Sequence, residues 1–278
     1  MEKLLYNGKL ITLEEGTFPL LNRSFLYGDG FFETIRFVSG AVSFAAAHWQ
    51  RMKDAAELLK MELPFRAQEN FESAVKELVR AKELTAARVR LQIWRDAPGL
   101  YRPEGGRPGY IIAAGNLEEQ EYKVFENGLD LKYYTTHLKS PSLLSTVKST
   151  GALIYVLAAM EIERPGSEDR IIFNTSNNPV EATSSNLFAV HNGMLYTPPL
   201  SEGCVNGVLR KKIIDLCSGN GILLKEEIIS RQMLESAEEI FLTNVIAGVR
   251  WARSLEGKNS YSHQLSDRLV RLLSEKAP

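Results

Sequence analysis

The chain has 278 residues, of which 44% are hydrophobic and 24% charged, and its formal net charge at pH 7 is −1. This length predicts about two domains with a substantial core, and the composition is typical of a globular protein. The balanced charge argues against a nucleic-acid-binding protein, so we expect the partner to be a small molecule or a second copy of the chain.

The N-terminus and the apolar runs bear on location. Residues 1–16 contain three glutamates and no apolar core of a secretory signal. The longest apolar run, residues 151–160, is about half as long as a membrane-spanning helix. We therefore expect a cytoplasmic protein without a membrane segment. Cys204 and Cys217 are expected to be unpaired thiols, and the scattered histidines and the absence of a CxxC motif argue against a metal site.

The first part of the chain predicts an α+β lobe, residues 1–117. Hairpins are indicated at Asn7-Gly8 and at Ser39-Gly40, each between two strand-like stretches. Two helices and then two strands are predicted after the hairpins, over residues 45–63, 67–84, 87–96 and 108–117. The charged segment 118–128 ends in Asn-Gly and is the expected linker.

The second part, residues 129–278, predicts a lobe of mixed strands and helices. A hairpin is indicated at His191-Asn192-Gly193, and an amphipathic helix follows Gly207. The sequence contains no fixed-period repeat, which excludes solenoids and propellers.

Lys148 is the only charged residue between Lys139 and Glu161, and an apolar run follows it. Apolar surroundings disfavour the charged form of a lysine and make its amine nucleophilic toward an aldehyde. The pattern predicts either a Schiff-base lysine or a lysine at a helix start whose ammonium reaches water.

Glu181 lies between a turn at residues 177–179 and the strand-like NLFAV, and small polar residues follow it. A carboxylate so placed can hold a pyridinium nitrogen in its protonated form. The alternative is a solvent-exposed glutamate in a loop.

A possible anion cradle follows. Gly207 precedes an amphipathic helix, so the amides of Val208 and Leu209 can point at a phosphate near the positive end of that helix. Thr243 and Asn244 end a buried-looking strand and offer further donors. Each signal is weak alone, because glycine before a helix is common.

Three arginines are candidate anion ligands. Arg51, in the first predicted helix, can supply a fixed cation for a phosphate, and Arg95 and Arg36, on strands, can bind a substrate carboxylate. Tyr27 and Phe32 can line a pocket beside the glycines of YGDG. Solvent-exposed arginines and a tight turn before a strand are the alternatives.

Taken together, these residues resemble the class IV aminotransferases, the fold-type IV enzymes that depend on pyridoxal 5′-phosphate. Members include branched-chain and D-amino-acid aminotransferases and 4-amino-4-deoxychorismate lyases. The resemblance covers nearly the whole chain, and its most specific part is Lys148 followed in order by EATSSNLFAVHNGMLYTPPL, NGVLRKKII and EIFLTN. It implies a D-amino-acid-aminotransferase-like fold of two α/β lobes with the cofactor between them, in a homodimer whose partner chain helps to close the active site.

The resemblance also implies residue roles. Lys148 matches the lysine that forms the Schiff base and then moves the proton at the substrate α-carbon, and Glu181 matches the partner of the pyridine nitrogen. The implied phosphate site comprises Arg51, the Gly207 turn with the amides of Val208 and Leu209, Thr243 and, more loosely, Asn244. Arg95 matches the arginine that binds a substrate carboxylate in the D-amino-acid and lyase branches.

The branch within the family stays open. Branched-chain members carry a tyrosine five residues after the lysine, where this chain has Leu153, with Tyr155 nearby. This departure and the YGDGFFET motif favour the D-amino-acid aminotransferase and lyase side. We expect a transaminase acting on an amino acid and a 2-oxo acid, with 4-amino-4-deoxychorismate lyase, which forms 4-aminobenzoate and pyruvate, as the alternative. A binding protein that had lost catalysis would lack the lysine or the glutamate, and both are present.

Overall fold

The computed structural model of the chain describes residues 2–12, 22–105, 107–258 and 260–276. Leu13, at the end of the first predicted hairpin, lies outside the described residues. The chain divides into two compact units: the first runs to Gln120 and includes Val147–Gly151, and the second comprises Glu121–Thr146 and Ala152–Lys276. The division after Gln120 falls inside the predicted linker, whereas the Lys148 segment, predicted in the second lobe, belongs to the first unit.

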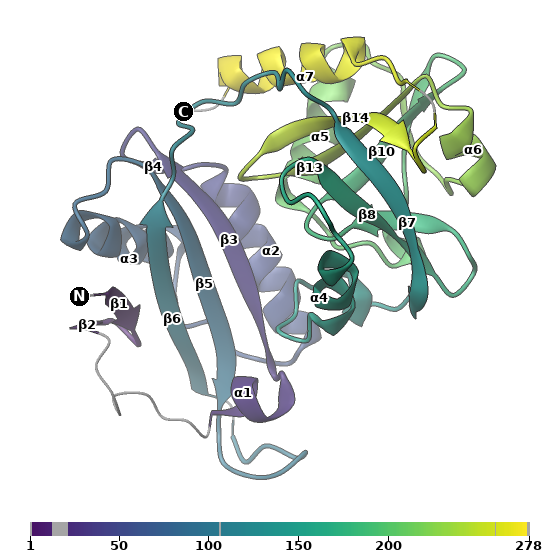
Figure 1. The fold of residues 1–278 in the computed structure, drawn as a ribbon. Coiled ribbons are helices and arrows are strands. Elements are labelled where there is room, and N and C mark those ends of the chain that lie inside the picture. The colour runs from purple at the N-terminus through teal and green to yellow at the C-terminus, as the bar shows by residue number, and fades with distance from the viewer. Residues whose placement is uncertain (1, 13–21, 106, 259, 277–278) are drawn as a thin grey trace. The chain divides into compact units, whose positions relative to one another are not determined.

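The first unit is built on an antiparallel sheet (Figure 1). Counted over the described residues, its six strands lie in the order β2-β1-β6-β5-β3-β4. They are β1 (Lys3–Tyr6), β2 (Lys9–Thr12), β3 (Gly30–Val38), β4 (Ala41–Val42), β5 (Ala87–Asp96) and β6 (Arg107–Asn116). Both predicted hairpins are confirmed, since Asn7 and Gly8 join β1 to β2 with φ of 45° and 80°, the positive values that such two-residue turns require, and β3 pairs with β4.

Helices α2 (Ala45–Leu58) and α3 (Gln68–Ala81) confirm the two predicted helices, and they pack on each other and on the sheet. α3 buries Phe71, Val75 and Leu78, which recur on one helical face. These side chains join those of the sheet in one apolar core. The short helix α1 (Arg23–Tyr27) ends at Gly28 in the left-handed region, with φ of 66°.

The Lys148 segment is extended rather than helical. Phe31 of β3 forms an antiparallel bridge with Ser149, and α4 begins only at Leu153. The interpretation of Lys148 as a residue at a helix start is therefore wrong.

The second unit is built on a mixed sheet. Over the same described part of the chain its eight strands lie in the order β12-β11-β10-β13-β14-β7-β8-β9, and β9 also pairs with β10, so most of the sheet closes into a ring. The strands are β7 (Leu129–Lys139), β8 (Glu168–Asn174), β9 (Pro179–Ala182), β10 (Asn186–His191), β11 (Met194–Thr197), β12 (Leu224–Glu226), β13 (Glu239–Asn244) and β14 (Gly248–Leu255). The predicted turn at Asn192-Gly193 joins β10 to β11.

Helices cover this sheet. They are α4 (Leu153–Met160), α5 (Val208–Gly219), α6 (Arg231–Glu235) and α7 (Gln264–Lys276), with short 3₁₀ turns η1 (Leu144–Thr146) and η2 (Leu200–Glu202). α4 packs on β7 and β8, and α5 and α7 pack on β13. The outer face of α4 is apolar, because Leu153 and Met160 are each 76% exposed and Val156 is exposed between them.

Two further findings limit the classes of site. In the described ranges no helix is long and apolar enough to cross a membrane. Among those same residues, no three His, Cys, Asp or Glu side chains are grouped in a way that could hold a metal ion. Cys204 and Cys217 are both buried thiols.

Candidate functional site

The predicted site residues fall into two groups, one in each unit, and each group has its own geometry. The first unit holds Lys148, Arg51, Arg95, Arg36, Phe32 and Tyr27, and the second holds Glu181, Gly207, Val208, Leu209, Thr243 and Asn244.

Lys148 is held at the edge of β3 by backbone hydrogen bonds. Phe32 N–H donates to the Lys148 carbonyl at 2.9 Å, and Thr150 N–H donates to the Gly30 carbonyl at 3.0 Å. The half-buried Lys148 side chain places Nζ 4.6 Å from the centroid of the Phe32 ring. Arg90 Cζ lies 3.8 Å from the same centroid. The structure thus brings Lys148 and Phe32 together and adds Arg90 beside them.

Arg51 is fixed by a buried carboxylate. Its Nε donates to Glu33 Oε1 at 2.8 Å, and its Nη2 donates to Glu33 Oε2. His48 Nδ1 lies 2.6 Å from that second oxygen. Burial raises the pKa of Glu33, but Arg51 and His48 outweigh this effect and hold the pKa at about 2. Glu33, 1% exposed, is therefore ionised and orients the Arg51 guanidinium; phosphate binding by Arg51 stays a prediction.

Arg95 donates its hydrogen bonds to the protein itself. Its Nε donates to Asp29 Oδ2 at 3.1 Å, and Nη1 and Nη2 donate to the carbonyls of Lys60 and Leu59 at 2.9 and 2.7 Å. These carbonyls follow the last turn of α2, where a cation is favourable. Arg95 therefore anchors the end of α2 to β5, and a substrate carboxylate would have to displace these bonds.

Arg36 and Tyr27 also have other partners. Arg36 is 2% exposed, and its Nη2 donates to the Glu119 carbonyl at 2.6 Å. A guanidinium this buried would have to move before it could reach a substrate, so substrate binding by Arg36 stays a prediction. The Tyr27 ring lies 5.5 Å from that of Tyr101, with Arg23 Cζ 4.9 Å from its centroid, and so packs on the loop after β5.

Glu181, on β9, sits in a buried hydrogen-bonded cluster. Lys139 Nζ forms an ion pair with Glu181 Oε1, and the Tyr155 hydroxyl donates to the same oxygen at 2.7 Å. Val205 N–H donates to Oε2 at 2.9 Å. The interpretation of Glu181 as an exposed loop residue is wrong, because its side chain is 3% exposed.

The N-terminus of α5 meets the same face of the sheet. Asn186 pairs with Glu181 on one side and with Thr243 on the other, and residues paired across strands place their side chains on one face. A Cβ at Gly207 would stand 1.9 Å from Asn186 Oδ1, so only glycine allows this approach. The first amides of α5, those of Val208 and Leu209, have no earlier helical carbonyl to bond.

Thr243 adds a hydroxyl that can still form hydrogen bonds. Its Oγ1 is buried and has no hydrogen-bond partner among the described residues. Such a group costs stability unless a ligand satisfies it. An anion bound at the α5 N-terminus would be close to this hydroxyl.

These features fit pyridoxal phosphate. The phosphate matches the helix N-terminus and the unsatisfied Thr243 hydroxyl, and the ring N–H matches the Glu181 carboxylate. The residues that would hold the cofactor in the second unit are thus Glu181, Val208, Leu209 and Thr243.

Asn244 has a structural role instead. Its Oδ1 accepts from the N–H groups of Ile246 and Ala247 at 3.0 and 2.8 Å, and its Nδ2 donates to Ser185 Oγ at 2.9 Å. The side chain therefore shapes the turn between β13 and β14, and its contact with the cofactor stays a prediction.

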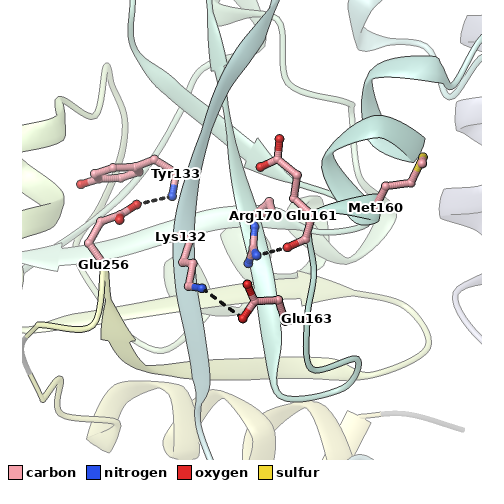
Figure 2. A pocket seen from close by; sticks show the side chains of 7 residues that line it. All are labelled: Lys132, Tyr133, Met160, Glu161, Glu163, Arg170 and Glu256. Atoms are coloured by element: carbon pink, nitrogen blue, oxygen red, sulfur yellow. Dashed lines mark hydrogen bonds and ion pairs between the residues drawn. The ribbon is translucent and has the colours of Figure 1, made fainter.

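A separate surface hollow of about 470 Å³ lies elsewhere on the second unit (Figure 2). Its lining is mostly charged: Lys132 pairs with Glu163, and Arg170 donates to the backbone carbonyl of Glu161. None of the predicted site residues lines it, so this hollow is not the candidate site.

The comparisons with known proteins decide the family. A model described as "Amino-transferase class IV" matches residues 30–255. The chain belongs to the class IV aminotransferase family. A branched-chain-amino-acid aminotransferase of Escherichia coli (strain K12) is 28% identical over 263 residues, which cover 91% of this chain and 84% of the relative.

Solved structures of two enzymes share the fold. A branched-chain amino acid aminotransferase from T.th., solved with pyridoxamine 5′-phosphate, has a TM-score of 0.84 at 25% identity, over 98% of this chain and 92% of that one. The 4-amino-4-deoxychorismate lyase from Pseudomonas aeruginosa has a TM-score of 0.86 at 24% identity, over 98% of both chains, a likeness of fold. The predicted resemblance and the mixed α/β fold-type IV class are confirmed, and the named relatives support a pyridoxal-phosphate-dependent transaminase.

The sequence did not single out three residues of the site in this class IV aminotransferase. Glu33 was visible as an acid within the apolar stretch FFETIR. Arg90 alternates with buried residues on β5 and so resembled a solvated arginine. Lys139 ends β7 after a run of exposed residues, and no local signal marks its burial.

Proposed function

We propose that the chain transfers an amino group between an amino acid and a 2-oxo acid, with pyridoxal phosphate bound covalently by Lys148. The single observation that supports it most is the second-unit site, where the buried carboxylate of Glu181 and the unsatisfied Thr243 hydroxyl lie on one sheet face beside the α5 N-terminus. When bound, the cofactor supplies an electron sink for the charge left after the substrate loses its α-proton.

The chain's own residues then have defined tasks. The Lys148 amine is the point of attachment and afterwards carries the proton at the α-carbon; the β3 edge holds its backbone in place. Glu181 accepts the ring N–H, the first amides of α5 and the Thr243 hydroxyl bind the phosphate, and Arg51, oriented by Glu33, adds a cation.

Arg90 is the best placed arginine for a substrate carboxylate. It shares the Phe32 ring with Lys148 and donates one hydrogen bond to the protein, to Gln92 Oε1 at 3.2 Å. Arg95 and Arg36, in contrast, donate to backbone carbonyls. Replacing Arg90 by Met should raise KM for the 2-oxo acid about tenfold or more, the size of one charge-assisted interaction. The exposed Arg88, replaced in the same way, is the matched control.

Attachment at Lys148 is tested by borohydride reduction and peptide mapping. The protein should absorb visible light after incubation with pyridoxal phosphate, and reduction should fix the cofactor to the peptide that contains Lys148. Lys148→Ala should abolish labelling and transfer. Labelling of Lys139, the buried lysine beside Glu181, would refute the assignment.

The donor is tested with a panel of L- and D-amino acids and either 2-oxoglutarate or pyruvate. Branched-chain L-amino acids are the first candidates, because the Escherichia coli relative is named for them. The lyase is the second candidate, since this chain and the Pseudomonas aeruginosa lyase align over 98% of both lengths. Formation of 4-aminobenzoate from aminodeoxychorismate, without amino transfer, would establish the lyase and overturn our preference.

We also propose a homodimer in the cytoplasm, as the family resemblance implies. The exposed apolar face of α4, which includes Leu153, Val156 and Met160, is a suitable interface with a second copy. Light scattering should give twice the chain mass, and Leu153→Lys should shift it toward the monomer. A wild-type chain that is monomeric at all concentrations would refute the dimer.

A further inference from the structure

Lys139 is a buried cation that none of the assignments above explains. It is the last residue of β7, and its side chain is 9% exposed. Its Nζ forms the ion pair with Glu181 Oε1 and donates to the Tyr155 hydroxyl at 2.6 Å. The Tyr155 hydroxyl in turn donates to that same carboxylate oxygen. β7, α4 and β9 each contribute one member of this cluster.

Stability alone is a poor reason for such a cluster. Burying two charges has a desolvation cost that their attraction often fails to recover, and well-packed apolar residues are commonly as stable or more so. The neighbouring strand β8 offers an apolar setting for such residues, since Ile172, which pairs with Glu181, is fully buried. A function that requires Glu181 to be ionised would explain why Lys139 lies beside it.

The two oxygens of Glu181 are used differently. Oε1 accepts from both Lys139 and Tyr155, whereas Oε2 accepts from Val205 N–H. A carboxylate oxygen accepts about two hydrogen bonds. Oε2 thus keeps an acceptor position, and the Val205 loop fixes its direction because Asn186 Nδ2 donates to the Val205 carbonyl at 2.8 Å.

We infer that Lys139 and Tyr155 are positioning residues, which fix the Glu181 carboxylate in its ionised form so that Oε2 accepts the ring N–H of pyridoxal phosphate. The inference rests on the proposed function. Neither residue touches the reacting atoms; both act through Glu181. Tyr155 serves as a neutral donor, because burial and the Glu181 carboxylate raise the pKa of its hydroxyl.

The tyrosine of α4 stands at position 155, not at position 153. Leu153 lies on the outer face of α4, 76% exposed, while Tyr155 lies two residues on and points its hydroxyl at Glu181. The tyrosine of α4 is therefore hydrogen-bonded to the carboxylate.

The test compares two cofactors in titrations of the cofactor-free full chain, read by fluorescence and absorbance. One is pyridoxal phosphate, and the other is its 1-deaza analogue, in which CH replaces the ring nitrogen. Lys139→Met should weaken binding of pyridoxal phosphate about tenfold or more, as is typical when the supporting partner of a ligand-binding group is lost. It should change binding of the deaza analogue less than about threefold, because that ring has no N–H for Glu181 to accept.

Matched variants separate positioning from packing. Lys139→Arg keeps the charge and should restore most of the selectivity for the ring nitrogen, and Tyr155→Phe, which removes one hydroxyl, should show a smaller loss of the same kind. If Lys139→Met does not fold, Tyr155→Phe carries the test. Equal losses for the two cofactors, or wild-type affinities in both Lys139→Met and Tyr155→Phe, would overturn the inference.

Experiments on the wild-type chain separate a failure of the inference about Lys139 and Tyr155 from a failure of the proposed function. A wild-type chain that binds neither cofactor and is not labelled at Lys148 refutes the proposed function. A wild-type chain labelled at Lys148 whose variants lose no selectivity refutes the role of Lys139 alone.

Discussion

Replacing Glu33 by Gln tests the buried cluster that orients Arg51. Glu33 accepts from Arg51 and His48 through both oxygens and is 1% exposed. Its removal takes the Glu33 carboxylate away from the Arg51 guanidinium, whose side chain is only 11% exposed. Breaking a buried pair in this way costs about 3–5 kcal/mol, so Glu33→Gln should lower the free energy of unfolding at pH 7 by that amount.

The pKa of Glu33 gives an independent magnitude. Its ordinary value is 4.5, and in the folded chain it is about 2. The difference corresponds to about 3 kcal/mol of stability. Because the folded value is the lower one, this stability is present above pH 4.5 and is lost as the pH falls through about 2. About 2 kcal/mol of it should be gone at pH 3.

The assay is urea unfolding of cofactor-free wild-type and variant chains at pH 7, 5 and 3. The difference in the free energy of unfolding between wild type and Glu33→Gln should be nearly the same at pH 7 and pH 5 and should be smaller at pH 3. Glu57→Gln, an exposed residue of the same helix as Arg51, is the control and should change stability by less than about 0.5 kcal/mol. The reasoning would be refuted if Glu33→Gln lost as little unfolding free energy as the control, or if its loss were not smaller at pH 3.

Three further predictions follow from the geometry. Thr243→Val removes a buried hydroxyl without a partner among the described residues. The free energy of unfolding of the cofactor-free chain in urea should therefore be unchanged or slightly higher, while titration should show weaker pyridoxal phosphate binding. Unchanged affinity would exclude the hydroxyl from the site. Arg95→Met should lower the melting temperature and leave KM for the 2-oxo acid within about twofold; a raised KM at unchanged stability would restore the substrate role. Burial raises the pKa of Cys204 to about 12 and that of Cys217 to about 11, so a disulfide reagent should label neither at pH 8 until the chain unfolds, and rapid labelling of the folded chain would contradict this.

Local signals were sufficient for much of the fold. Asn7-Gly8 and Asn192-Gly193 predicted hairpins because their residues tolerate the positive φ that these turns need. The helix α3 was predicted from apolar spacing, and the structure buries that face. Such features depend on neighbours within a few residues, which a single sequence displays.

Features that depend on distant residues were not predictable in the same way. The pairing of Ser149 with Phe31 joins positions far apart in the chain. Lys148 was therefore predicted in the second lobe rather than the first unit, and a helix start was one of its two interpretations. Lys139 follows exposed residues on β7 and becomes buried only because Glu181 and Tyr155 approach it. The partners of Arg95 are backbone carbonyls, and no side-chain pattern reveals them.

The position of Val147–Gly151 has a consequence for cutting the chain into fragments. These residues belong to the first unit although the sequence on both sides of them belongs to the second. Neither unit is therefore a continuous segment. A fragment that ends at Gln120 would leave the edge of β3 without its hydrogen bonds to Lys148 and Thr150. The complementary fragment would carry Lys148 without the strand that orders it, so neither piece alone should retain a structured Lys148.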